Sequence, residues 1–179
     1  MPVRNEVSGE PDQAGNHRFR FDVVTEAHVR EAMTWRYDPP YDFYNPPAEP
    51  TVGDLASMLS RESPHFAVIG PDDALIGFIG IGYEAQVPGG DYTEGAIDIG
   101  IGLRPDWTGR GIGRIVLESF IREADFTGSR LRATIAAFNL RSRRTFEHLG
   151  FRETARFRTG SAEAPIEWVV MVKPFPDAV

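Results

Sequence analysis

The sequence predicts an α/β (α+β) domain built on a mixed, mostly antiparallel sheet of about six to seven strands with helices on both faces. Three observations predict it. The apolar residues Ile97, Ile99, Ile101 and Leu103 alternate with a period of two, as in a strand with one face in the core. From Ile112 onward the apolar residues recur instead at helical spacing. No internal repeat or linker interrupts the chain, so these elements belong to a single domain.

The composition is that of one globular domain. Its 179 residues are enough for a full core, and 41% of them are hydrophobic. Cysteine is absent, which excludes a disulfide framework and a thiolate nucleophile. No apolar run approaches the roughly 20 residues that span a bilayer. The start Met1–Asn5 lacks a hydrophobic signal region, so we expect a cytoplasmic protein with no membrane partner. The net charge of −7 argues against nucleic acid as a partner and leaves basic acceptors plausible.

The N-terminal segment differs from the rest of the chain. Residues 1–16 contain few aliphatic side chains and are rich in polar residues and glycine, which predicts a disordered tail before a domain at 17–176. A first strand is expected from His17. Thr25, followed three positions later by His28, predicts the start of a helix that reaches Trp35.

A loop rich in proline and aromatic residues follows at 37–47, and a second helix is expected to open at Thr51 or Gly53 and to end before Pro64. A meander comes next, with strands at 65–70, 74–84 and 92–103 separated by turn sequences.

The remaining strands are expected at 131–138, 151–158 and 166–172. The last two offer an edge that could pair with a second copy, so a homodimer is possible.

The turn between the strand at 92–103 and the helix from Ile112 has the composition of a phosphate cradle. Glycines let the backbone approach an anion closely, and the amides at a helix start attract it. A P-loop would need Lys followed by Ser or Thr after the last glycine, but Arg114 and Ile115 stand there. A dinucleotide fold would need an acid in the next strand, and the strand at 131–138 has none.

A second motif follows at Asn139–Phe151, and with both motifs in this order the chain resembles the GNAT superfamily of acyl-CoA-dependent N-acyltransferases. The first motif of that family reads Gln/Arg-x-x-Gly-x-Gly/Ala; Thr108–Gly113 keeps both glycines but has Thr108 at the leading position. The second reads Asn-x-x-Ser/Ala-x-x-x-Tyr-x-x-x-Gly-Phe, and four positions match: Asn139, Ser142, Gly150 and Phe151. Phe146 takes the tyrosine position. The resemblance covers Phe19 to about Pro174.

The resemblance implies that the central strands ending at Leu103 and Phe138 splay apart and that the pantetheine arm of acetyl-CoA inserts between them. The residues it implies for holding acetyl-CoA are Ile101, Gly102, Leu103, Thr108, Gly109, Arg110, Gly111, Ile112, Gly113, Arg114, Asn139 and Ser142. Asn139 is also expected to be a helix N-cap. Of the arginines beside the two motifs, some are expected to meet the CoA phosphates, and the candidates are Arg104, Arg110, Arg114, Arg141, Arg143 and Arg144.

Amine acylation needs a base, and Asp98 is the leading candidate, with Glu84 and Glu94 as alternatives. Asp98 matches a position where many members of the family carry a strand carboxylate. By strand parity it shares a face with Gly100 and Gly102, whose missing side chains leave space for a ligand. No general acid is assigned, because phenylalanine at position 146 has no proton to give.

The aromatic loop is expected to wall the acceptor site, since this fold places its acceptor-facing loops there; the candidates are Trp35, Tyr37, Tyr41, Phe43 and Tyr44. The four histidines show no metal-ligand spacing, so no metal is expected. The favoured function is acetyl transfer from acetyl-CoA to a primary amine of a small molecule or a protein N-terminus, by direct attack in a ternary complex. The alternative is a CoA-binding sensor or assembly module with weakened catalysis, for which Phe146 and Thr108 are the motivating departures. O-acylation of an alcohol is a third option.

Overall fold

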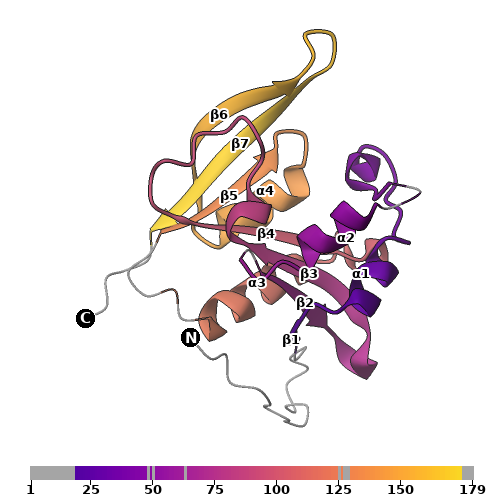
Figure 1. Ribbon diagram of the computed structural model, residues 1–179. Coiled ribbons are helices and arrows are strands. Elements are labelled where there is room, and N and C mark those ends of the chain that lie inside the picture. The colour runs from indigo at the N-terminus through magenta and orange to yellow at the C-terminus, as the bar shows by residue number, and fades with distance from the viewer. Residues whose placement is uncertain are drawn as a thin grey trace.

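The computed structural model describes residues 19–174, apart from 48, 50, 63, 125 and 127–129. One sheet of seven strands runs through the molecule in the order β1-β2-β3-β4-β5-β7-β6 (Figure 1). The strands are β1 (Arg20–Val23), β2 (His65–Ile69), β3 (Leu75–Ile81), β4 (Ile97–Leu103), β5 (Arg130–Ala136), β6 (Arg152–Gly160) and β7 (Pro165–Pro174). All neighbouring pairs are antiparallel except β4 and β5.

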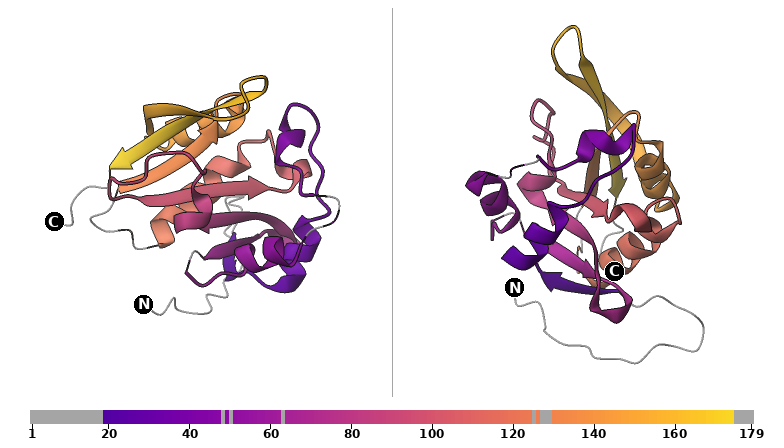
Figure 2. Two further views of the ribbon diagram at one scale, coloured as in Figure 1. Left: turned by 45° about the horizontal axis from the view of Figure 1, so that its top comes forward. Right: turned by 90° about the vertical axis from the view of Figure 1, so that its right-hand side faces the viewer.

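Helices cover both faces of the sheet, as Figure 2 shows in its right-hand view. The helices are α1 (Glu26–Ala32), α2 (Val52–Met58), α3 (Ile112–Glu123) and α4 (Leu140–His148). α1 and α2 lie on one face, and α3 and α4 lie on the other. The predicted fold class, a mixed and mostly antiparallel sheet with helices on both faces, is therefore confirmed.

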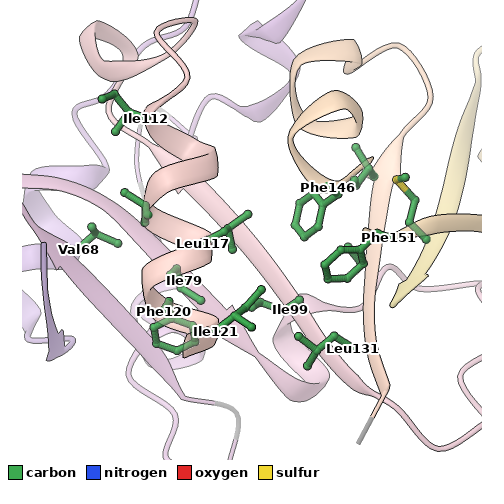
Figure 3. Close-up of a cluster of buried hydrophobic side chains, with 14 of the residues drawn as sticks. Val68, Ile79, Ile99, Ile112, Leu117, Phe120, Ile121, Leu131, Phe146 and Phe151 are labelled. Carbon is green, nitrogen blue, oxygen red and sulfur yellow. The ribbon is translucent and has the colours of Figure 1, made fainter. Parts of the chain in front are cut away.

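Each face of the sheet has its own hydrophobic core. The larger core lies under α3 and α4 and includes Ile79, Ile99, Leu117 and Phe146 (Figure 3). The smaller core lies under α1, where Val29, Trp35, Ala67 and Phe78 pack together. Side chains alternate between the two cores along the strands, because successive residues of a strand point to opposite faces.

The parallel pair of β4 and β5 separates soon after it begins. Its ladder holds only two pairs, Ile97 with Leu131 and Asp98 with Arg132. Beyond Asp98, the edge of β4 that faces β5 pairs with no strand among the described residues, while its other edge stays paired with β3 through Leu103. The splayed central strand pair that the family resemblance implied is present.

The strand expected at 92–103 is shorter than predicted, because β4 begins at Ile97. Side chains fold the preceding residues into a loop. Asp91 accepts hydrogen bonds from the amide and the hydroxyl of Thr93. The hydroxyl of Tyr92 binds both the amide and the carbonyl of Val87. These bonds compete with a strand ladder.

The ends of other strands and helices also differ from the prediction. The strand expected at 74–84 ends at Ile81, where a tight turn at Gly82–Ala85 begins. The first helix ends at Ala32 instead of Trp35, but its start is confirmed by a reciprocal pair of hydrogen bonds between Thr25 and His28. The predicted tail at 1–16 lies outside the described residues. Within the part of the chain that the structure describes, no helix is long and apolar enough to cross a membrane.

Candidate active site

The glycine-rich turn leads into the N-terminus of α3. Gly109 and Gly111 have φ angles of +75° and +77°. These left-handed conformations favour glycine. A Cβ atom built on either residue would meet nothing within 4 Å, so the space over the turn is open. Gly111 caps α3 without a side-chain hydrogen bond, which leaves the first amides of this 12-residue helix available to an anion.

Thr108, which departs from the family motif, has its own role in the turn. Its hydroxyl donates a hydrogen bond of 2.7 Å to the carbonyl of Pro105. The Thr108 side chain therefore stabilises the turn through a hydrogen bond inside it. Arg110 and Arg114 are exposed beside it, and their side chains form no hydrogen bond within the described part of the chain.

Three other arginines near the motifs already have partners. Arg104 forms two bonds with Asp106 and a third with the carbonyl of Leu75. Arg143 reaches the carbonyl of Ala137. Arg141 stacks on Tyr41 with 4.3 Å between its guanidinium carbon and the ring centroid. Arg110 and Arg114 are thus better placed for phosphate than Arg104 or Arg143.

The second motif, Asn139–Phe151, spans the whole of α4. Asn139 caps this helix, since its side-chain oxygen accepts from the amide of Ser142 at 3.1 Å, as expected. Phe146 is 1% exposed and packs edge-on against Phe151, with ring centroids 4.9 Å apart (Figure 3). Phenylalanine at this position is therefore part of the core.

A pocket of about 290 Å³ lies on the opposite face of the sheet, between α1, α2 and the strands β3 and β4. We call it the α1/α2 pocket. Its described lining residues are Ala32, Met33, Trp35, Tyr37, Tyr44, Pro46, Met58, His65, Phe78, Gly80, Glu84, Ala85, Gly100, Ile101 and Gly102. Three of the five residues expected to wall the acceptor site, namely Trp35, Tyr37 and Tyr44, are among them.

Tyr41 and Phe43 lie elsewhere. Tyr41 packs on Arg141 of α4, and Phe43 contacts Phe138 and Trp168. Neither lines the α1/α2 pocket. These contacts hold this part of the loop against α4, against Phe138 just after β5, and against β7.

Glycines form the floor of the pocket. His65 of β2, Gly80 of β3 and Gly100 of β4 lie side by side across three strands. A Cβ atom at Gly80 would lie 3.0 Å from Nε2 of His65, so the imidazole ring occupies the space that a side chain on Gly80 would take. At Gly102 a Cβ would meet nothing within 4 Å. Asp98, Gly100 and Gly102 do alternate with Ile99 and Ile101, as the strand pattern predicted.

Asp98, the leading candidate for the base, is enclosed by hydrogen-bond donors. It is 2% exposed. Nε of Arg132 lies 2.6 Å from one carboxylate oxygen, and a terminal nitrogen of Arg132 lies 2.8 Å from the other. Gln86 donates a third bond of 2.8 Å. A carboxylate that is buried and bound by three donors is closed to a substrate amine, so this environment favours a structural role.

The two alternatives differ in position. Glu94 lies on the surface, with its side chain 83% exposed and paired with Arg130 at 3.3 Å. Glu84 lies in the turn after β3 and lines the α1/α2 pocket beside Gly100. The hydroxyl of Ser57 on α2 donates to its carboxylate at 2.7 Å, which orients the group.

Among the described residues that line the pocket, His65, Tyr37 and Tyr44 have a shifted pKa, and burial is the main cause of the rise for Tyr44. Burial lowers the pKa of His65 below its usual 6.5, and the nearby Glu84 opposes this shift. No group in the described chain bonds the buried Nδ1 of His65. Burial raises the pKa of Tyr37 to about 12. The Tyr37 hydroxyl donates to the carbonyl of Leu103 at 2.8 Å, which connects the pocket to the end of β4.

Sequence reasoning missed His65, Met33 and Met58 as pocket residues. His65 could have been found from its place opposite Gly80 in a hairpin, but the methionines come from helix ends whose packing no local pattern reveals. Among the residues described, no group of three or more acidic or histidine side chains is arranged to hold a metal ion.

The profile of the acetyltransferase (GNAT) domain family matches residues 18–152. The chain belongs to this family. None of the curated proteins compared with this GNAT chain matches it.

Several solved structures share its fold. The GNAT chain matches yncA from Salmonella typhimurium, solved with acetyl-CoA, at a TM-score of 0.63 and 19% identity, over 92% of this chain and 96% of that one. It matches AAC(6')-Ib, solved with ribostamycin and coenzyme A, at a TM-score of 0.61 and 16% identity, over 87% of this chain and 93% of that one. The ribosomal-protein-S18-alanine N-acetyltransferase from Escherichia coli matches at a TM-score of 0.62 and 18% identity, over 90% of this chain and 97% of that one. At these identities the likeness shows the fold alone, and the acceptor must be argued from this chain.

Proposed function

We propose that this GNAT acetyltransferase transfers the acetyl group of acetyl-CoA to a primary amine by direct attack in a ternary complex. The observation that carries the proposal is the position of the α1/α2 pocket. It contains the carboxylate of Glu84, and its floor includes Gly100, Ile101 and Gly102 of the strand that leads to the glycine-rich turn. An amine in the pocket and a thioester between the splayed strands would meet across this strand. Such positioning converts a bimolecular reaction into an effectively unimolecular one.

The residues present fit acetyl-CoA. The open space over Gly109 and Gly111 and the free amides of α3 suit the pyrophosphate, with Arg110 and Arg114 beside them. The unpaired edge of β4 after Asp98 offers backbone groups to the amides of the pantetheine arm. Bound there, acetyl-CoA supplies the activated acyl group.

We assign Glu84 as the base. The Glu84 carboxylate attracts the protonated amine and removes its proton, either directly or through water. The neutral nitrogen then forms a bond to the thioester carbonyl carbon, and the carbon–sulfur bond breaks. The nitrogen loses its second proton as the amide forms, so the products are the amide, the CoA thiolate and two protons, one taken by Glu84 and one passed to water or to the thiolate. Asp98 has a different task in this proposal, since with Arg132 it fixes the point where β4 and β5 separate.

No side chain is needed to protonate the thiolate. Phe146 is sealed in the core, and the hydroxyl of Thr145 donates to the carbonyl of Arg141. A thiol of pKa about 8.5 is a tolerable leaving group, and water can supply the proton.

The experiment that tests the proposal measures thiol release from acetyl-CoA by the purified protein, with and without primary amines, together with CoA binding. Amine-dependent release supports the transferase. CoA binding with no release for any amine supports instead the sensor or assembly module, for which the departures at Thr108 and Phe146 remain the argument. Release that depends equally on alcohols would point to O-acylation.

A further inference from the structure

The described lining of the α1/α2 pocket contains a single acidic side chain. Of its described lining residues, Glu84 is the only acid, and none is lysine or arginine. The one histidine, His65, lies against Gly80, and burial keeps it neutral at pH 7. Among the lining residues that the structure describes, the pocket therefore offers a ligand one carboxylate and no basic side chain.

The rest of the wall is largely apolar. Met33 ends α1 and Met58 ends α2, and both face the pocket. Trp35 also lines the pocket and packs against Phe78, with 5.5 Å between ring centroids. These side chains can cover an aliphatic or aromatic group, but they carry no opposite charge that could pair with a second ionised group.

From this distribution of charge we infer that the acceptor is a small apolar monoamine, meaning a primary amine on an aromatic or aliphatic body that carries no other charged group. The inference rests on the proposed N-acetyltransferase function and specifies its substrate class. The amine would lie at Glu84, and the apolar body would lie against Met33, Met58 and Trp35.

The same charges disfavour other amines. A free amino acid would bring its carboxylate within a few ångströms of Glu84, with no basic side chain to receive it. A polyamine or an aminoglycoside would place further ammonium groups against the apolar wall, which is costly without partners. The volume of about 290 Å³ is at the lower end for a ligand site and suits a small acceptor.

The test compares four acceptors at fixed acetyl-CoA: 2-phenylethylamine, phenylalanine, spermidine and a short peptide with an N-terminal phenylalanine. Phenylalanine differs from 2-phenylethylamine only by its carboxylate. We expect kcat/KM for 2-phenylethylamine to exceed that for each of the others by about tenfold or more. Calorimetry in the presence of CoA should give the same order of binding, independently of turnover.

Two variants test the assignment of the wall. Met58→Glu adds a second acid and should raise kcat/KM for spermidine relative to 2-phenylethylamine by about tenfold. Glu84→Gln should weaken calorimetric binding of 2-phenylethylamine. Glu118→Gln, which removes an exposed carboxylate from α3 on the other face of the sheet, should change neither quantity and is the matched control.

The possible failures are distinguishable. Better turnover of phenylalanine or spermidine than of 2-phenylethylamine would overturn the substrate class and leave the transferase intact. A higher kcat/KM for the peptide than for 2-phenylethylamine would contradict a small-molecule acceptor and favour a protein N-terminus. An unchanged acceptor preference in a folded Met58→Glu variant would also contradict the inference. No turnover of any amine would overturn both the inference and the proposed function.

Discussion

Two acids at the ends of neighbouring strands have opposite environments in this protein. Asp98 is 2% exposed and bound to Arg132, whereas Glu84 lines a pocket and has the hydroxyl of Ser57 as its partner. Strand alternation in the sequence was enough to place Asp98 on the same face as Gly100 and Gly102. It could not reveal the pairing with Arg132, because that contact joins two strands far apart in the chain.

This contrast predicts that Asp98→Asn and Glu84→Gln fail in different ways. Asp98→Asn leaves the buried Arg132 without its charge partner and should lower the free energy of unfolding by about 3–5 kcal/mol. Glu84→Gln should keep most of the stability and lower kcat by roughly 10²–10⁴-fold. Denaturant unfolding and steady-state kinetics measure the two effects. If the Asp98→Asn enzyme is stable but inactive and the Glu84→Gln enzyme is active, the base is Asp98 and not Glu84.

His65 gives a prediction about pH. Its pKa is lower in the folded chain than the usual 6.5, because burial disfavours the cation more than Glu84 favours it. Below pH 6.5 the unfolded chain thus binds more protons, so stability falls as the pH drops. His65→Asn should remove this part of the loss. Unfolding titrations at pH 7.5, 6.5 and 5.5 should show the stability advantage of wild type over the variant shrinking as the pH falls; a constant or growing advantage would contradict the account.

At the scale of elements, the strand–turn–helix unit of β4 and α3 is the part that the sequence predicted best. Alternation, glycines and helical spacing are all local signals, so they indicate the unit without knowledge of its neighbours. Two boundaries differ from the prediction: β3 ends at Ile81, where the backbone turn Gly82–Ala85 begins, and β4 starts only at Ile97, after a loop held by side-chain bonds. The pocket wall was predicted only in part, because it combines residues from α1, α2, β2 and β3.

The turn gives a matched pair of glycine variants. A Cβ atom meets nothing within 4 Å at Gly111 or at Gly95, but only Gly111 has a positive φ angle. Gly111→Ala should therefore cost roughly 1–2 kcal/mol of stability through backbone strain, and it should weaken CoA binding. Gly95→Ala should do neither. Unfolding curves and calorimetry with CoA are the measurements, and equal behaviour of the two variants would contradict the role of the turn.

At the scale of the whole molecule, the sheet consists of two halves joined by two parallel residue pairs. β1 to β4 form one half, and β5, β7 and β6 form the other, with the β6–β7 hairpin projecting from the body (Figure 1). The family resemblance implied this splay. The period-two pattern of apolar residues could not have predicted the splay, because such a pattern identifies each strand but not the distance between strands. A ligand inserted at the fork would contact both halves.

Acetyl-CoA should therefore stabilise the fold as a whole. A ligand at 100 times its Kd adds about 2.7 kcal/mol. For a chain of 179 residues, this corresponds to a rise in Tm of about 5–11 °C. Thermal unfolding with increasing acetyl-CoA measures the shift, and Gly111→Ala at the same ligand concentration should show a smaller one. An unchanged Tm at saturation would contradict the CoA site.

The most direct test of the central claim measures CoA thiol release from acetyl-CoA with 2-phenylethylamine, with mass spectrometry of the acetylated amine, for wild type and Glu84→Gln. The account predicts that wild type forms one N-acetylated amine per thiol released, and that Glu84→Gln binds CoA normally but turns over at least 100-fold more slowly. CoA binding without amine-dependent thiol release, for this amine and every other amine of the panel, would contradict it.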